Sequence, residues 1–471
     1  MDEFDLVVLG AGPTGENLAE RAHAGGLSVA VVESELVGGE CSYWACMPSK
    51  ALLRPAAARA EATRVAGARE AVTGPLDAAA VLARRDAFAS HWKDDGQADW
   101  VASAGLTLVR GHGRLDGERR VVVEAADGTH RVLTARHAVA VCTGTRAAVP
   151  DLPGIADARV WTSREATSAK AVPGRLAVVG GGVVAVEMAT AWRALGSEVT
   201  LLVRGARLLP KLEPFAGDLV ADSLRDSGVD VRFGVSVTKV HRDGGTVTLT
   251  TGDGTVEADE VLFATGRTPA TADIGLDTVG LTPGRPVEVD DTGAATGVPG
   301  GWLYAAGDVN GRALLTHQGK YQGRVFGAVI ADRAAGRALD TTDWGRSVAT
   351  ADRYAVPQVV FTDPEVAAVG RTYEEARAAG HRVRAVDYDL GSVAGASLYA
   401  DDYRGRARAV VDLDREVLLG VTFVGAGVSE LLHSATVAVV AEVPVARLWH
   451  AVPAYPTISE VWLRLWETYR G

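Results

Sequence analysis

The chain contains little cysteine and has an excess of acid over base. Only three cysteines occur among 471 residues, which excludes a disulfide-stapled scaffold. In a reducing compartment, two cysteines close in sequence indicate catalysis or metal binding more often than a structural bridge. The 48 basic residues are outnumbered by 59 acidic ones, for a net charge of -11. Because neutralising phosphates requires a basic surface, this balance argues against a nucleic-acid-binding protein.

Long apolar runs are also absent. No stretch approaches the roughly 20 apolar residues of a membrane span. The first five residues, Met-Asp-Glu-Phe-Asp, are acidic where a signal peptide would be basic. We therefore expect a cytoplasmic protein that makes no membrane contact. The length predicts roughly three domains, and 47% hydrophobic residues with 54 glycines are typical of a globular α/β protein.

A nucleotide-binding pattern opens the chain. An apolar run at residues 5–9 leads into Gly10, Gly12 and Gly15, and a helix-compatible segment follows. The next apolar run ends at Glu33, at the spacing expected for a carboxylate that binds a ribose hydroxyl. In this pattern the glycines allow a tight turn, close approach to a pyrophosphate, and packing of helix on strand. We interpret the segment as a dinucleotide site.

The pattern recurs at Gly180, Gly182 and Ala185, so a second dinucleotide site is predicted. Here the ribose-binding acid is missing, and Arg204 and Arg207 follow the second strand instead. A guanidinium pairs well with a 2′-phosphate, which favours NADPH over NADH. The alternative is that these arginines belong to a solvated loop.

Cys41 and Cys46 lie at the start of a helical stretch, and Lys50 follows. The positive end of a helix dipole and a nearby cation both favour a thiolate. Four intervening residues allow the pair to cycle between dithiol and disulfide. Buried structural thiols and a metal site are the alternatives, but no second cysteine cluster supplies further metal ligands. Cys142 follows an apolar strand and is expected in the core.

Taken in order, these features resemble the pyridine nucleotide-disulfide oxidoreductases, which include lipoamide dehydrogenase, glutathione reductase and mercuric reductase. The resemblance covers essentially the whole chain. It depends on both glycine patterns, the Cys-x4-Cys segment followed by Pro-Ser-Lys, and three short motifs. These motifs are Thr143-Gly144-Thr145, Thr265-Gly266-Arg267-Thr268-Pro269 and Ala306-Gly307-Asp308-Val309, and residues 361–370 resemble the start of the family's dimerisation domain.

The resemblance implies a role for each matching residue. Cys46 would face the flavin of FAD, and Cys41 would attack the substrate. Lys50 would lie near the flavin ring, Glu187 beside the nicotinamide, and Asp308 on the ribityl chain. The residues implied to bind cofactors are Gly10, Gly12, Gly15, Glu33, Gly39, Lys50, Thr143, Gly144, Gly180, Gly182, Glu187, Arg204, Arg207, Gly266, Arg267, Gly307 and Asp308.

Two departures from the family pattern bear on the substrate. Disulfide reductases of the family carry a His followed five residues later by Glu, as an acid/base pair supplied by the partner subunit. Here Glu460 is kept, but Tyr455 replaces the His. A phenol with a pKa near 10 exchanges protons less readily at neutral pH than an imidazole. His450 lies five residues upstream of Tyr455, and we interpret it as an interface or surface residue.

The second departure is the segment between the two cysteines, where Tyr43-Trp44-Ala45 replaces smaller residues. These rings would either wall the disulfide and stack on a planar substrate, or pack against the adjacent helix. No metal-binding residues are assigned.

We therefore predict an α/β fold with two Rossmann-like domains and a C-terminal α/β dimerisation domain. The FAD domain would cover 1–150 and 271–345, the NAD(P) domain 151–270, and the dimerisation domain 346–471. The predicted enzyme is a homodimer with shared active sites. It passes electrons from NAD(P)H through FAD to the Cys41–Cys46 disulfide and on to a small disulfide-type acceptor. Reduction of a quinone or a metal ion, and a lipoamide dehydrogenase-like role in a multienzyme complex, are the alternatives.

Overall fold

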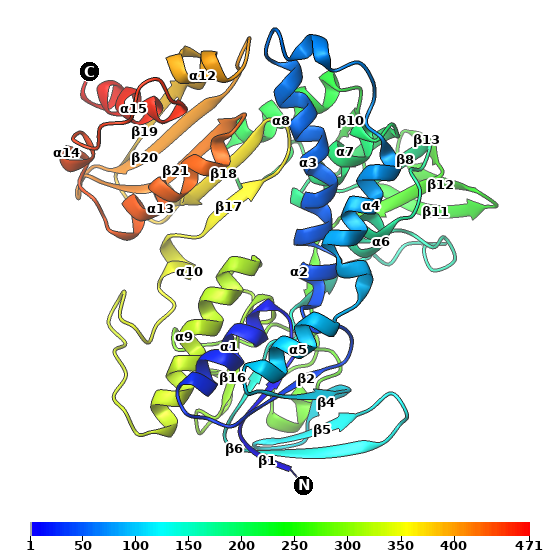
Figure 1. Cartoon of the computed structure of the whole chain (residues 1–471), viewed down its shortest axis with the longest axis vertical. Coiled ribbons are helices and arrows are strands. Elements are labelled where there is room, and N and C mark those ends of the chain that lie inside the picture. The colour runs from blue at the N-terminus through cyan, green and yellow to red at the C-terminus, as the bar shows by residue number, and fades with distance from the viewer. Residues whose placement is uncertain (1) are drawn as a thin grey trace. The chain divides into compact units, whose positions relative to one another are not determined.

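The computed structural model describes residues 2–471. The chain divides into two compact units, each built from three segments. Unit 1 contains Met1–Met47, Asp86–Ala147 and Arg267–Arg353, and unit 2 contains Pro48–Arg85, Ala148–Gly266 and Tyr354–Gly471. Figure 1 shows the elements of both units. These two units are defined by which segments pack together and not by which cofactor they bind. The domain limits predicted from the sequence therefore stay a prediction.

Unit 1 is built on a seven-stranded sheet with the order β3-β2-β1-β6-β5-β4, in which β16 also pairs with β6. The strands β1, β2, β3, β6 and β16 run parallel, and β4 and β5 form an antiparallel extension. The strands are β1 (Asp2–Leu9), β2 (Val29–Glu33), β3 (Thr107–Arg110), β4 (His112–Leu115), β5 (Arg120–Glu124), β6 (His130–Val141) and β16 (Leu303–Ala305). A two-stranded ribbon pairs β7 (Thr145–Ala147) with β15 (Arg267–Pro269).

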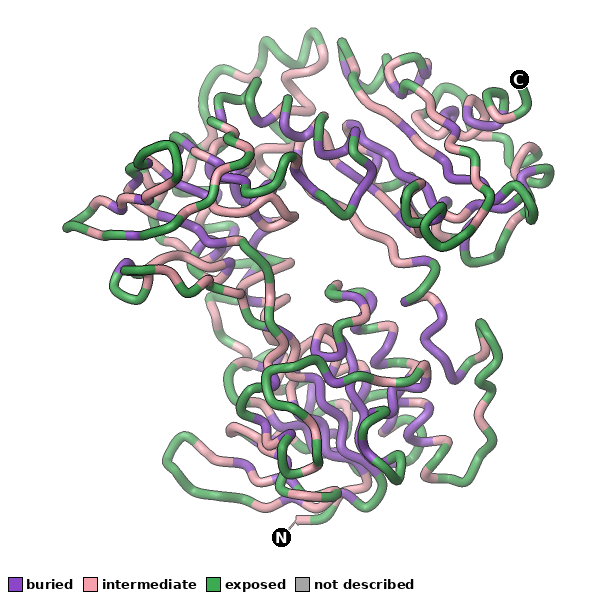
Figure 2. Tube along the Cα trace, turned by 180° about the vertical axis from the view of Figure 1, so that it is seen from behind, coloured by how far each residue is buried: buried purple, intermediate pink, exposed green. Residues whose placement is uncertain are grey.

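The sheet of unit 1 is buried on both faces, which explains the continuous apolar run in β1. Leu6 and Val8 face a core that Leu18 and Phe326 complete. Val7 and Leu9 pack into the core on the opposite face of the sheet. The helices of this unit are α1 (Pro13–Ala24), α2 (Gly39–Tyr43), α5 (Asp95–Ser103) and α9 (Thr316–Ala334). Figure 2 shows the buried strands inside this unit.

Unit 2 contains a four-stranded parallel sheet with the order β10-β9-β8-β14. Its outer face is covered by a separate antiparallel sheet, β11-β12-β13, through a shared apolar core. The strands are β8 (Arg175–Val179), β9 (Glu198–Val203), β10 (Asp230–Phe233), β11 (Val237–Asp243), β12 (Thr246–Thr251), β13 (Gly254–Ala258) and β14 (Glu260–Phe263). The accompanying helices are α4 (Ala78–Phe88), α6 (Ser163–Ser168), α7 (Val183–Ala194) and α8 (Pro214–Asp226).

The last third of the chain forms a five-stranded antiparallel sheet with the order β17-β18-β21-β20-β19. Its strands are β17 (Pro357–Val360), β18 (Glu365–Gly370), β19 (Val383–Asp389), β20 (Arg406–Asp412) and β21 (Val417–Gly425). The helices that follow β18 are α11 (Tyr373–Ala378), α12 (Ala394–Tyr399), α13 (Leu432–Val440), α14 (Val445–Leu448) and α15 (Val461–Arg470), whereas α10 (Ala351–Tyr354) lies almost entirely in the last segment of unit 1. Helix α3 (Cys46–Thr63) begins in unit 1 and continues in unit 2.

Within residues 2–471, no helix combines the length and apolar character that crossing a bilayer requires.

Candidate active site

The first glycine-rich turn connects β1 to α1 and leaves an open space at the helix N-terminus. Gly10 has a positive φ of 102°, and a Cβ there would lie 2.5 Å from the Cys142 carbonyl oxygen. Nothing lies within 4 Å of a Cβ placed on Gly12, the N-cap of α1. Backbone N–H groups at a helix N-terminus bind anions, so this turn can hold a phosphate.

Glu33, the last residue of β2, lies beside this turn. Its Oε2 accepts a hydrogen bond of 2.8 Å from the backbone N–H of Ala11, and its Oε1 accepts one of 2.7 Å from Glu35. Burial raises the pKa of Glu33 above the usual range of a carboxyl. Each oxygen retains a lone pair, so the side chain can still accept hydrogen bonds from ribose hydroxyls.

Asp308 follows β16 and forms a polar cluster with residues from two other segments. Thr145 Oγ1 donates a hydrogen bond of 2.7 Å to Asp308 Oδ2, and Arg267 Nε donates one of 2.6 Å to Thr145 Oγ1. Burial raises the pKa of Asp308. The structure thus brings together all three short motifs singled out in the sequence, and Thr145 is the residue that joins the other two.

The turn before Asp308 is held by a buried network that the sequence did not reveal. Gln322 Oε1 accepts a hydrogen bond of 2.7 Å from the backbone N–H of Gly307. Gln322 Nε2 donates a hydrogen bond of 2.9 Å to Asp352 Oδ2. No motif marks either side chain, since the contacts depend on how α9 packs.

The polar atoms of this region fit FAD. Among residues 2–471, the buried Thr143 Oγ1 and Glu16 Oε1 have no hydrogen-bond partner, although buried polar atoms are nearly always paired. Thr143 adjoins the first glycine turn, because a Cβ on Gly10 would lie 3.2 Å from the Thr143 nitrogen. An open phosphate site, a carboxylate for a ribose and an unpaired hydroxyl beside the glycine turn are what a dinucleotide needs.

The two cysteines lie on consecutive helices, Cys41 in α2 and Cys46 at the first position of α3. Both are free thiols in the structure. Cys46 Sγ lies 3.1 Å from the hydroxyl oxygen of Thr316, the first residue of α9. Thr316 belongs to none of the motifs identified in the sequence, and it lies 270 residues after Cys46 in the chain.

The surroundings of Cys41 disfavour its thiolate. A hydrogen bond to Cys46 is the main reason that the pKa of Cys41 is raised, and burial raises it further. Thr316 and the positive charge of Lys320 act in the opposite direction. The two sulfur atoms are therefore close enough to share a proton, as a dithiol that forms a disulfide must be.

Of the two aromatic residues between the cysteines, Tyr43 is turned into the protein, whereas Trp44 is half-buried, so a stacking role for Trp44 stays a prediction. Tyr43 is buried, and its hydroxyl lies 2.6 Å from Gln97 Oε1 and 3.0 Å from the Val37 carbonyl oxygen. Trp92 Nε1 donates a hydrogen bond of 3.1 Å to the Tyr43 carbonyl oxygen. Tyr43 therefore packs against the segment that precedes and begins α5, and Trp44 meets its ring edge-on.

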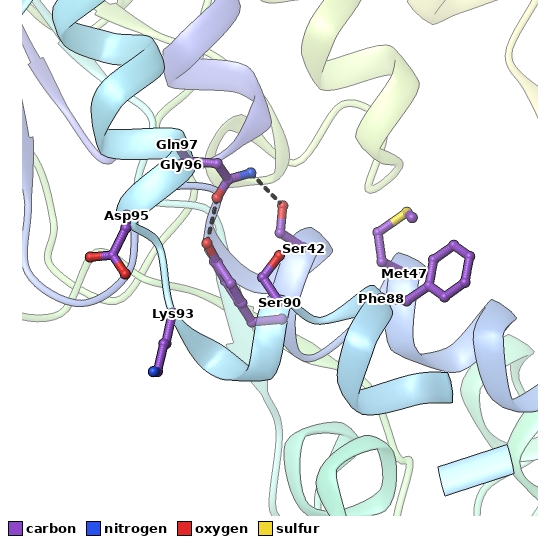
Figure 3. Close-up of a pocket in the computed structure, with 9 residues that line it drawn as sticks. Ser42, Met47, Phe88, Ser90, Lys93, Asp95, Gly96 and Gln97 are labelled. Atoms are coloured by element: carbon purple, nitrogen blue, oxygen red, sulfur yellow. Dashed lines mark hydrogen bonds between the residues drawn. The ribbon is translucent and has the colours of Figure 1, made fainter. Parts of the chain in front are cut away.

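A pocket of about 450 Å³ lies next to this loop (Figure 3). In Figure 3, Met47 and Phe88 lie side by side, while Gln97 bridges Ser42 and the Tyr43 hydroxyl. Neither reactive cysteine is among its lining residues, which are Ser42, Tyr43, Met47, Phe88, Ser90, Lys93, Asp95, Gly96 and Gln97. The pocket therefore backs the redox loop and does not open onto its sulfur atoms.

In unit 2, the second glycine turn joins β8 to α7, and Gly182 is again an open N-cap. One turn into α7, Glu187 is buried, and its Oε2 lies 2.7 Å from Lys50 Nζ. Its Oε1 accepts a hydrogen bond of 3.0 Å from the backbone N–H of Phe361. Lys50 also lies over the Phe361 ring, 5.1 Å from its centroid. The predicted roles of Lys50 and Glu187 beside the cofactors stay predictions.

Arg204 and Arg207 follow the end of β9, next to the second glycine turn. The backbone N–H of Leu209 donates a hydrogen bond of 2.8 Å to the Gly181 carbonyl, which holds this loop against the turn. Arg204 is exposed, and Arg207 donates a hydrogen bond of 3.1 Å to the Pro210 carbonyl. Arg204 is therefore exposed to solvent, and its predicted contact with a 2′-phosphate stays a prediction.

Tyr455 and Glu460, the two residues predicted from the C-terminal motif, differ in exposure. The Tyr455 side chain is 76% exposed, whereas Glu460 is 5% exposed. Glu460 Oε2 accepts a hydrogen bond of 3.3 Å from the backbone N–H of Gly395. His450 is exposed. Tyr455 is thus available to a partner, and Glu460 is used inside its own chain.

Among residues 2–471, no group of three or more His, Cys, Asp or Glu side chains is placed to hold a metal ion.

Comparisons with known proteins agree with this geometry. The chain is 30% identical over 464 residues to the mercuric reductase of Staphylococcus aureus, covering 97% of this chain and 81% of the relative. It is 32% identical to dihydrolipoyl dehydrogenase 3 of Pseudomonas aeruginosa, covering 98% and 96%. The Cu(II) complex of the HOCl-induced flavoprotein disulfide reductase RclA from Escherichia coli has the same fold, with a TM-score of 0.84 over 99% of both chains at 24% identity.

Two family domains account for most of the chain. Residues 356–465 match the dimerisation domain of the pyridine nucleotide-disulphide oxidoreductases, and residues 4–323 match the family's main domain. Members of this family are enzymes that use FAD and NAD(P)H. The chain belongs to the pyridine nucleotide-disulphide oxidoreductase family.

Proposed function

We propose that this enzyme uses NADPH to reduce the Cys41–Cys46 disulfide and that the dithiol then reduces a small disulfide-type acceptor. The observation that supports this most directly is the arrangement of the thiols. Cys46 Sγ lies 3.1 Å from the Thr316 hydroxyl oxygen at the start of α9, and a hydrogen bond joins the two thiols. The two sulfur atoms are thus adjacent, which a pair that cycles between dithiol and disulfide requires.

The chain's own residues would hold the cofactors as follows. Gly12 and its neighbours bind a phosphate, Glu33 a ribose, and Asp308 the remaining hydroxyls of FAD. Bound FAD supplies the hydride and electron chemistry that amino-acid side chains lack. In total, NADPH and a proton convert the disulfide to two thiols and NADP⁺, and an acceptor disulfide returns the pair to its oxidised form while leaving as two thiols.

A metal-ion or quinone acceptor is the second candidate, and Tyr455 is the observation that favours it. A disulfide acceptor must have its leaving thiolate protonated, and a phenol does this poorly at neutral pH. A soft metal ion binds thiolates directly and needs no such acid. The relatives include both mercuric reductases and dihydrolipoyl dehydrogenases, so both acceptor classes occur among them.

We further propose that the enzyme is a homodimer in which the C-terminal segment contributes to the partner's site. Large apolar side chains are exposed on α13 and in the segment before α15. They are Val437, Val440, Val452 and Tyr455, with exposed fractions of 52%, 37%, 86% and 76%. Exposed apolar residues gathered in a dimerisation domain are suited to burial against a second copy.

Anaerobic titration with NADPH tests the relay. The wild type should develop the long-wavelength absorbance of a thiolate packed against an oxidised flavin, and Cys46→Ser should lose it. Cys142→Ala is the matched control: it removes the third cysteine, a core residue behind the first glycine turn, and should keep the absorbance once FAD is bound. If Cys46→Ser turns over normally and the wild type shows no such absorbance, the cysteine relay is wrong. If the relay holds, the rates at which the wild type reduces a small disulfide, Hg²⁺ and a quinone distinguish the three acceptor classes.

A further inference from the structure

One face of α9 carries a polar residue that contacts the redox cysteines and, one turn later, a lysine. Thr316 and Lys320 are four positions apart, so they lie on the same side of the helix. Thr316 Oγ1 is 3.1 Å from Cys46 Sγ. The first turn of α9 is fixed against α1, because a Cβ on Gly319 would overlap the Thr14 hydroxyl. Lys320 thus stands one turn beyond a residue that contacts the cysteine pair.

The charge of Lys320 acts on two buried groups. It lowers the pKa of Cys41, against the larger effects of the Cys46 hydrogen bond and of burial. It also opposes the burial that raises the pKa of Glu16, on α1, to about 7. Glu16 Oε1 has no hydrogen-bond partner among the described residues. The positive charge of Lys320 therefore favours the ionised form of both Cys41 and Glu16.

The charged groups around Cys41 come from four helices. Glu40 on α2 is 3.6 Å from Arg267 and is thereby balanced. The first position of α3 supplies Cys46, whose negative charge disfavours a second thiolate. Glu16 of α1 adds negative charge whenever it is ionised. Lys320 of α9 is the group among them whose positive charge favours ionisation of Cys41.

We propose that the ammonium of Lys320 stabilises Cys41 as the attacking thiolate, in a chain where Tyr455 replaces the family's imidazole. This proposal rests on the proposed dithiol relay. Once a disulfide acceptor binds, the proton of Cys41 passes to solvent. Its thiolate forms a bond to one acceptor sulfur, and the acceptor S–S bond breaks with its electron pair on the leaving thiolate, which takes a proton from solvent. Cys46 then attacks Cys41, which restores the internal disulfide and releases the second thiolate.

The test measures alkylation of Cys41 by iodoacetamide in the NADPH-reduced holoenzyme, as a function of pH, with the modified peptide identified by mass spectrometry. In Lys320→Met, the alkylation rate at pH 7 should fall several-fold and its midpoint should move to higher pH, because a positive charge that favours the Cys41 thiolate is removed. Lys320→Arg should stay within about twofold of the wild type, because the charge is kept. Lys239→Met, at an exposed position of β11, is the matched control and should change nothing.

A second measurement needs no variant. Raising the salt concentration should slow alkylation of wild-type Cys41, because Lys320 is exposed and its field is screened. The same salt change should leave Lys320→Met unaffected. An unchanged pH profile in Lys320→Met, together with normal long-wavelength absorbance in the wild type, would overturn the role of Lys320 alone. Absence of that absorbance in the wild type would instead overturn the relay on which the role rests.

Discussion

Lys50 and Glu187 are 137 residues apart in the chain, and Lys50 Nζ lies 2.7 Å from Glu187 Oε2. The carboxylate is nearly fully buried, while the lysine side chain is 36% exposed. The contact ties α3 to α7, and the Phe361 backbone completes the hydrogen bonding of the carboxylate. The pair thereby fixes a cation at a defined position in unit 2.

Replacing Glu187 by glutamine should therefore weaken both stability and cofactor reduction. The amide keeps the shape but loses the charge that holds Lys50. We expect a loss of about 1–3 kcal/mol in the free energy of unfolding, measured by urea titration. Stopped-flow reduction of the bound flavin by NADPH should slow by about tenfold if Lys50 orients the reacting groups. Glu198→Gln, an exposed position of β9, serves as the control. Unchanged reduction kinetics would show that the pair is purely structural.

Glu16 should make stability depend on pH. Burial raises the pKa of Glu16 from 4.5 to about 7, so the folded chain holds a proton that the unfolded chain has released between these pH values. The contribution of Glu16 to the free energy of unfolding is therefore fully present below pH 4.5 and is lost as the pH rises through about 7. Glu16→Gln should flatten this slope and raise the free energy of unfolding above pH 7, by up to about 3 kcal/mol.

Urea unfolding of the two holoenzymes, wild type and Glu16→Gln, between pH 5 and pH 8.5 measures how the free energy of unfolding of each depends on pH. Other carboxyls with raised pKa values, such as Glu33 and Asp308, are present in both proteins and cancel. Glu20→Gln, an exposed position of the same helix, should keep the wild-type slope. Parallel slopes for Glu16→Gln and the wild type would contradict an ionisation near neutrality.

Tyr455→His should increase activity on small disulfides. An imidazole titrates near neutral pH, and a positioned acid or base contributes about 10²–10⁴-fold to rate, so we expect at least a tenfold gain in kcat/KM at pH 7. Tyr455→Phe should leave the activity unchanged, because the phenol hydroxyl contributes little proton transfer. A gain that disappears in a monomeric variant would place the residue in the partner's site. No gain would mean that the shape of the acceptor site, rather than the missing base, limits the rate.

Arg204→Ala should reduce the preference for NADPH. Arg204 is exposed at the end of β9, where a 2′-phosphate would be bound. Loss of one charge-assisted contact of about 1.5–3 kcal/mol predicts a fall of tenfold or more in kcat/KM for NADPH, with little change for NADH. Arg225→Ala, on the exposed face of α8, is the control. Equal losses with both cofactors would rule out phosphate recognition by Arg204.

Local patterns in the sequence were sufficient for the cofactor turns and the family. A glycine turn between a strand and a helix depends on a few neighbouring residues, so both turns and the spacing of Cys41 and Cys46 are visible without a fold. The replacement of histidine by Tyr455 is equally visible. These features carry the α/β class, the FAD and NAD(P)H cofactors and the doubt about ordinary disulfide reduction.

Tertiary structure decided which distant groups serve the cysteines. Thr316 meets Cys46 across 270 residues, and no spacing rule connects them. Tyr43 turns inward because Gln97 and the Val37 carbonyl meet its hydroxyl, which a sequence pattern does not record. Lys320 is one of many exposed charges in the sequence, and only the packing of α9 against α1 brings its charge to Cys41. Packing between residues that are distant in the sequence therefore decides which hydroxyls and charges surround the two thiols.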